Sequence, residues 1–211
     1  MKKEKMVTVT IKNGAEFTVE LPESKIAEIF GASYGKVELS TLKAGETFST
    51  GEHEWVVLEQ SGDTTAVLLK DCLKDYRRFD ASSNNWVTSE LRKWLNNGFA
   101  KEIEQEIGKD NLVAHTPDLS TDDGSDDYAS DGKKDKVSML SCNSYRQYHK
   151  VIPKIDSWYW TLTPLSSEVW ESFVRFVSGY GALGDYGCND DLGGVRPFLI
   201  VKSNILILKG E

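Results

Sequence analysis

The residue types that could do chemistry in this chain begin with a run of aspartates between residues 116 and 135. Carboxylate oxygens are the ligands that Ca²⁺ prefers, so the run raises the question of a calcium site. No calcium-loop register fits, because placing Gly132 at the turn leaves Ala129 at a ligand position and Ser138 where a bidentate glutamate belongs. A solvated loop is the favoured interpretation, with calcium as the open alternative. The aspartates are Asp118, Asp122, Asp123, Asp126, Asp127, Asp131 and Asp135.

The histidines and cysteines form no recognisable catalytic or metal-binding pattern. The histidines are scattered, at His53, His115 and His149, with no nucleophile or metal ligand beside any of them. The cysteines make neither an even set nor a CxxC pair, which argues against a disulfide framework and a zinc site; they are Cys72, Cys142 and Cys188. Cys188 lies in a polar segment that we expect to be exposed, so it is the thiol to test. We therefore expect no catalytic residue, no metal and no cofactor.

Charge and hydropathy argue against nucleic acids and membranes as partners. The chain has 211 residues and a net charge of −8, with a pI near 5.0. Nucleic-acid binding draws most of its affinity from lysine and arginine, so a nucleic-acid partner is not expected. No apolar run is long enough to span a bilayer, and the basic start Met1-Lys2-Lys3 has no apolar stretch behind it. These features predict a protein made in the cytoplasm, without a signal peptide or membrane anchor.

The elements that would position any site divide into two domains. Residues 7–11 and 17–21 alternate apolar and polar around Asn13-Gly14, which predicts a hairpin. A helix is predicted over residues 22–30, with Ile26, Ile29 and Phe30 on one face. Residues 1–36 are therefore predicted to form a small ββα appendage, serving as an attachment or oligomerisation element.

Residues 37–211 are predicted to form one α+β domain. Strands are expected at residues 51–59, 64–69, 158–163, 198–202 and 205–208, and a short one near 137–140. Helices are expected within residues 86–96 with Thr88 or Ser89 as the cap, at 100–107 with Gly108 ending the second, and from Ser141 through Tyr148. Residues 173–177 fit a helical face and a strand equally well. Trp86 and Trp94 lie on periodic apolar faces, so we expect both in the core.

Residues 178–191 have the composition of a binding surface. Tyrosine supplies rigid amphipathic area, and serine, glycine and asparagine supply adaptable polar contacts. The plain alternative is a β-hairpin and loop. Arg196, in Gly193-Gly194-Val195-Arg196-Pro197, is expected to pin backbone carbonyls rather than touch a ligand. The predicted ligand contacts are Trp160, Arg175, Tyr180, Asp185, Tyr186 and Asn189.

Four sequence blocks occur in order in the part of the chain from about Leu42 onward. They are Trp86, Ser89, Leu91, Arg92, Trp94, Leu95 and Asn96; then Asp135, Val137, Leu140 and Ser141; then Trp158-Tyr159-Trp160-Thr161-Leu162-Thr163-Pro164; and finally Gly194-Val195-Arg196-Pro197. With these blocks the chain resembles a bacterial and phage domain family of unknown function. Leu162-Thr163 stands where that family has Arg-Ser, so no role of that arginine carries over.

The resemblance implies a C-type-lectin-like fold, a twisted antiparallel sheet flanked by two helices. That family is similar to formylglycine-generating enzymes and to the variable proteins of diversity-generating retroelements. The enzyme branch depends on a cysteine pair, and this chain has only Cys188 in the corresponding region. The resemblance therefore implies a non-enzymatic display protein that presents residues 160–190 to a protein or glycan, in a phage or prophage setting. The alternatives are an oxidoreductase that uses Cys188 and a structural virion component.

Overall fold

The computed structural model describes residues 6–12, 16–22, 25, 35–125, 128 and 132–210. The chain forms two compact units, Met1–Val37 and Glu38–Glu211. In the first unit β1 (Met6–Lys12) and β2 (Glu16–Pro22) pair antiparallel, which confirms the predicted hairpin strands. The Asn13-Gly14 turn and most of the helix predicted over residues 22–30 lie outside the described residues.

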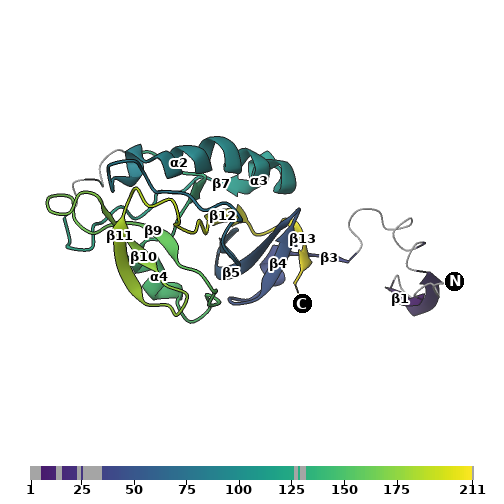
Figure 1. Cartoon of the computed structure of the whole chain (residues 1–211). Coiled ribbons are helices and arrows are strands. Elements are labelled where there is room, and N and C mark those ends of the chain that lie inside the picture. The colour runs from purple at the N-terminus through teal and green to yellow at the C-terminus, as the bar shows by residue number, and fades with distance from the viewer. Residues whose placement is uncertain are drawn as a thin grey trace. The chain divides into compact units, whose positions relative to one another are not determined.

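A curled antiparallel sheet forms the frame of the second unit (Figure 1). Its strand order is β3-β13-β4-β5-β6-β12-β7, and β8 also pairs with β12. The predicted strands at residues 64–69 and 198–202 match β6 and β12, whereas β4 and β7 had no clear local signal. The bounds are β3 (Lys36–Glu38), β4 (Thr47–Thr50), β5 (His53–Ser61), β6 (Thr64–Leu69), β7 (Leu112–Val113), β8 (Val137–Ser138), β12 (Phe198–Lys202) and β13 (Leu206–Lys209).

The helical segment after Trp86 is one continuous run. It contains α2 (Glu90–Trp94), a π-helical turn (η4, Leu95–Phe99) and α3 (Ala100–Ile107), where the sequence predicted two separate helices. The Ser89 side chain accepts from the Arg92 N–H, and Gly108 ends the run with φ +89°. Figure 1 shows α2 and α3 along one side of the unit and α4 (Cys142–Tyr148) on the other. Ser141 caps α4 as predicted, accepting from the Ser144 N–H.

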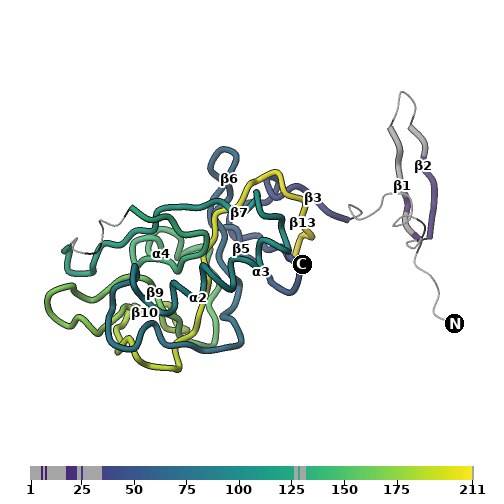
Figure 2. The backbone as a smooth tube through the Cα atoms, turned by 90° about the horizontal axis from the view of Figure 1, so that it is seen from above, coloured from purple at the N-terminus to yellow at the C-terminus, as the bar shows by residue number. Residues whose placement is uncertain are grey.

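A second sheet has the order β11-β10-β9, and its strands hold about half of residues 160–190. Its strands are β9 (Tyr159–Pro164), β10 (Phe173–Val177) and β11 (Leu183–Gly187). The ambiguous segment at 173–177 is thus a strand, and part of the predicted irregular stretch is its hairpin partner. Both views place this sheet at the opposite end of the second unit from β13 (Figures 1 and 2).

One apolar core joins the two sheets to α4. β9 is buried along its whole length, and the Trp160 N–H donates to the Gly194 carbonyl at 3.0 Å. The predicted α+β class is therefore confirmed. Among the residues that the structure describes, no helix has the length and apolar character needed to cross a bilayer. The core residues shared by these elements are Val56, Leu58, Leu68, Leu140, Tyr145, Ile152, Tyr159 and Val177.

Candidate functional site

An open groove of about 670 Å³ lies beside the three-stranded sheet, and we call it the aromatic groove. The Trp158 ring lies 5.1 Å from Phe176 and 5.7 Å from Tyr186, centroid to centroid. Tyr180 is 90% exposed and Tyr186 is 50% exposed. Large apolar rings are thus held at the surface instead of in the core. The groove is lined by Lys154, Ile155, Asp156, Ser157, Trp158, Phe176, Ser178, Gly179, Tyr180 and Tyr186.

The turn that carries Tyr180 is fixed by several hydrogen bonds. The Gly181 N–H donates to the Ser178 carbonyl at 2.8 Å, and the Tyr145 hydroxyl donates to the Gly181 carbonyl at 2.7 Å. Gly181 has φ +87°, a conformation that favours glycine. A Cβ at Gly179 would lie 2.5 Å from the Ile155 carbonyl oxygen, so the backbone packs closely there. The aromatic groove is therefore built on an ordered hairpin.

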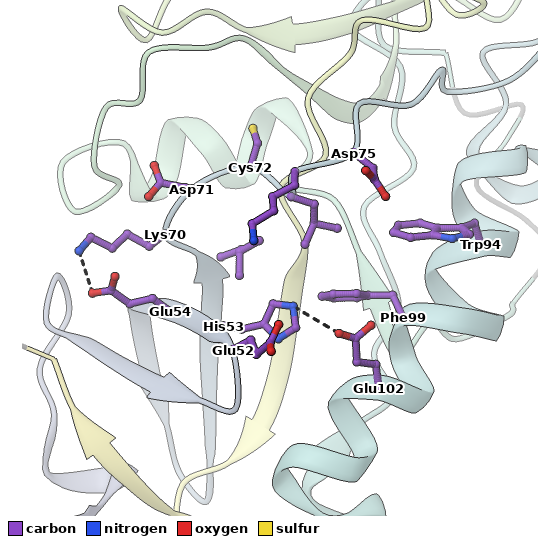
Figure 3. A pocket seen from close by; sticks show the side chains of 13 residues that line it. Glu52, His53, Glu54, Lys70, Asp71, Cys72, Asp75, Trp94, Phe99 and Glu102 are labelled. Atoms are coloured by element: carbon purple, nitrogen blue, oxygen red, sulfur yellow. Dashed lines mark hydrogen bonds and ion pairs between the residues drawn. The ribbon is translucent and has the colours of Figure 1, made fainter.

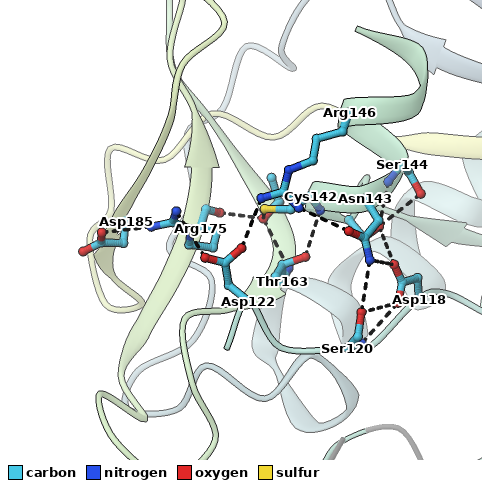
Figure 4. A network of polar contacts seen from close by, with 12 residues as sticks. Asp118, Ser120, Asp122, Cys142, Asn143, Ser144, Arg146, Thr163, Arg175 and Asp185 are labelled. Carbon is cyan, nitrogen blue, oxygen red and sulfur yellow. Dashed lines mark hydrogen bonds and ion pairs between the residues drawn. The ribbon is translucent and has the colours of Figure 1, made fainter. Parts of the chain in front are cut away.

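Two predicted contact residues, Arg175 and Asp185, are engaged with each other. They are directly opposed on β10 and β11, with their side chains 3.1 Å apart. Arg175 also pairs with Asp122 at 3.3 Å, and Asp122 pairs with Arg146 of α4 at 3.3 Å (Figure 4). Asp185 and Tyr186 are successive strand residues, so their side chains point to opposite faces. Arg175 and Asp185 thus pair on the face of the hairpin opposite Tyr186. The predicted contact residues therefore do not form one shared face.

The structure corrects two further expectations. Trp160 is 0% exposed, and its indole N–H donates to the Arg77 carbonyl at 2.9 Å, so it cannot contact a ligand. Cys188 is 1% exposed rather than on the surface, and burial raises the pKa of its thiol. Asn189 is exposed in the turn after β11 but does not line the aromatic groove.

The carboxylates of the described aspartates in the 116–135 segment accept hydrogen bonds or form ion pairs with other residues of the chain. Asp118 accepts from Ser120, Ser141 and Asn143 (Figure 4). Burial raises the pKa of Asp118, but those hydrogen bonds outweigh it and leave the pKa below its usual value. Hydrogen bonds, the first from Ser166, hold the pKa of Asp123 at about 2. These contacts favour a structural role over calcium binding. Asp126, Asp127 and Asp131 lie outside the described residues.

Two of the predicted structural residues are buried and one is not. Trp86 is 1% exposed. The Arg196 guanidinium is also buried and donates to the carbonyls of Leu69, Lys70 and Pro153. Trp94 departs from its prediction, because it is only partly buried and lines a surface pocket, with the Arg77 guanidinium 4.1 Å from its ring centre.

The pocket beside Trp94 has a volume of about 370 Å³ and is rich in carboxylates, so we call it the acidic pocket (Figure 3). His53 lies at its edge with Nδ1 2.9 Å from Glu106 Oε1 and Nε2 3.8 Å from Glu102 Oε1. Sequence reasoning found no partner for His53, because the two glutamates belong to a different element. Glu102 and Glu106 lie on one face of the helix at residues 100–107, and this spacing was the signal in the sequence that two carboxylates could share a site. The lining residues are Glu52, His53, Glu54, Leu69, Lys70, Asp71, Cys72, Leu73, Lys74, Asp75, Trp94, Phe99 and Glu102.

Comparison with known proteins identifies one family. Residues 62–203 match DUF6273, a domain of unknown function. No curated protein and no solved structure matches the chain significantly. The matched region contains all four sequence blocks and the whole aromatic groove. The match covers well over half of the 211 residues, and the chain therefore belongs to the DUF6273 family of domains of unknown function.

Proposed function

We propose that the second unit is a non-enzymatic binding module and that the aromatic groove holds its protein or glycan ligand. The observation that carries this proposal is the exposure of Tyr180 and Tyr186 next to Trp158 and Phe176. Exposed apolar patches on soluble proteins mark interaction sites, and aromatic side chains dominate the energy of such sites.

The surroundings of the aromatic rings suit an extended polar ligand. Lys154 and Asp156 are both exposed at the rim, where they offer one cation and one anion for hydrogen bonds. The ordered Tyr180 turn reduces the conformational entropy lost on binding. A peptide or an oligosaccharide would place apolar faces on the rings and polar groups at the rim.

The chemistry of the thiols supports a binding role over the oxidoreductase alternative. That alternative needs a reactive Cys188, which is buried and has a raised pKa. The C-type-lectin-like fold and the phage or prophage setting remain part of the proposal. The curled antiparallel sheet flanked by helices is compatible with that fold.

The test is a screen of the protein on a glycan array and on a displayed peptide library, followed by affinity measurement on the best hit. Tyr180→Ala and Tyr186→Ala should each weaken binding by about tenfold or more. Tyr76→Ala is the control, since Tyr76 is 51% exposed and lies outside the aromatic groove. Unchanged affinity in both groove variants would reject the site. A glycan hit and a peptide hit distinguish the two ligand classes.

A further inference from the structure

A chain of hydrogen bonds fixes the proton position on His53. The Trp55 indole N–H donates to Thr50 Oγ1 at 2.8 Å, and the Thr50 hydroxyl donates to Glu106 Oε2 at 2.8 Å. Glu106 Oε1 lies 2.9 Å from His53 Nδ1. An indole only donates and a carboxylate only accepts, so Nδ1 must carry the proton in this chain. In the neutral imidazole the free lone pair is then on Nε2, on the side away from Glu106.

The imidazole is held firmly by its surroundings. His53 faces Thr50 across the β4–β5 hairpin, and its ring lies 5.3 Å from Phe99 in an edge-to-face contact. Gly51 turns this hairpin with φ +52°, and a Cβ there would overlap the Glu106 carboxylate. The His53 side chain is consequently only 11% exposed. A histidine that binds a metal through one ring nitrogen usually donates the N–H of the other nitrogen to an acceptor such as a carboxylate, which fixes the orientation of the ring.

The opposite nitrogen faces a second carboxylate. His53 Nε2 and Glu102 Oε1 are 3.8 Å apart. A lone pair and a carboxylate oxygen are both acceptors, so neutral His53 makes no hydrogen bond to Glu102, and a cation between them would satisfy both. Tetrahedral zinc places two of its ligand atoms about 3.4 Å apart. The Glu102 side chain is 59% exposed and free to move over that small difference.

The charge of the acidic pocket also favours a cation. Five carboxylates line it against two ammonium groups, which leaves three negative charges in excess with His53 neutral. The pocket is open to solvent, so water can complete the coordination of a bound ion. The carboxylates are Glu52, Glu54, Asp71, Asp75 and Glu102, and the ammonium groups are those of Lys70 and Lys74.

We propose that the acidic pocket binds a divalent first-row transition-metal ion through Nε2 of His53 and the carboxylate of Glu102. Glu106 is a positioning residue that keeps the proton on Nδ1. Imidazole together with carboxylate suits zinc and its neighbours better than calcium, which prefers oxygen ligands alone. This inference is independent of the aromatic groove, which is formed by other residues.

The test is calorimetric titration of the tag-free full chain with Zn²⁺. The wild type should bind one equivalent, and Glu102→Gln should weaken binding by at least tenfold. Glu102 is exposed, so this substitution leaves the fold intact, as its unfolding temperature would verify. Glu106→Gln should lower the affinity for Zn²⁺ by about 10-fold to 100-fold, which is the usual effect of removing a residue that orients a metal ligand.

Two matched variants control for charge and for surface histidine. Glu104→Gln removes the same charge from the same helix, but Glu104 pairs with Lys136. His149→Gln removes an exposed histidine that does not line the acidic pocket. Both should bind Zn²⁺ as the wild type does. The proposal is overturned if the wild type gives no one-equivalent binding or if Glu102→Gln binds unchanged. A sulfur-to-metal absorption band with Co²⁺ would also overturn it, since it would show a thiolate ligand, and Cys72 is the cysteine that lines the pocket.

Discussion

Arg92 and Asp135 form an ion pair with an N–O distance of 2.7 Å, and the Asp135 side chain is only 1% exposed. The other Asp135 oxygen accepts from the Trp86 indole at 2.7 Å. Nearby, Asn96 Oδ1 accepts from the Lys136 N–H at 2.8 Å. Two of the four sequence blocks therefore meet in one buried joint between α2 and the start of β8. These contacts give Trp86, Arg92, Asn96 and Asp135 a structural role.

Breaking this joint should destabilise the protein strongly. Asp135→Asn leaves the Arg92 guanidinium, which is 13% exposed, without its counter-ion. Loss of one partner of a buried pair costs about 3 kcal/mol or more. We expect Asp135→Asn to lower the free energy of unfolding, measured in urea, by that amount. Glu90→Gln, which breaks the exposed pair with Arg78, is the control and should have little effect. Equal effects of the two substitutions would contradict the structural role of the joint.

His115 should make stability depend on pH. Burial lowers the pKa of His115, and Asp135 opposes this only in part. The unfolded chain then binds a proton more readily than the folded one, so stability falls as pH drops below the unfolded value of about 6.5. We expect wild-type stability to fall between about pH 7.5 and 5.5, and His115→Gln to flatten that fall. His149→Gln, at an exposed position, should keep the wild-type slope. An unchanged slope in His115→Gln would count against the prediction.

Elements with a strong local signal were predictable from sequence. β6, α4 with its Ser141 cap and α3 with its Gly108 end all carry such signals. β11 carries none, because two of its five residues are glycine and one is aspartate, all poor strand formers. Pairing with β10 holds it in place, and pairing is not visible in a local pattern.

The candidate sites were predictable only in part. Composition pointed to Tyr180 and Tyr186, which do lie in the aromatic groove. It could not separate Trp158, which lines the groove, from Trp160, which is fully buried two residues later. Gly193 leaves room for the buried Trp160 indole, because a Cβ at that position would overlap the ring. The acidic pocket depends on contacts between β5 and α3, which only tertiary packing creates.

Gly194 should be intolerant of a side chain. A Cβ there would lie 2.4 Å from the Trp158 carbonyl oxygen, which is backbone and cannot move aside cheaply. We expect Gly194→Ala to lower stability by about 2–3 kcal/mol in thermal unfolding. Gly98→Ala is the matched control, because its Cβ would meet nothing closer than 3.9 Å within a helical segment. That substitution should stabilise the protein by about 0.5–1 kcal/mol. A Gly194→Ala variant as stable as the wild type would contradict the close approach of Gly194 to the Trp158 carbonyl.

All three thiols should be inert in the folded protein. Burial raises the pKa of Cys72 to about 11, and it also raises those of Cys142 and Cys188. Only the thiolate reacts with iodoacetamide, and a raised pKa lowers the fraction of thiolate in the folded chain. Intact mass should therefore stay unchanged after brief native treatment and rise by three adducts once guanidinium chloride unfolds the chain. Rapid native labelling of Cys188 alone would contradict this prediction and would restore the oxidoreductase alternative, because that reaction needs an accessible, ionised thiol at this position.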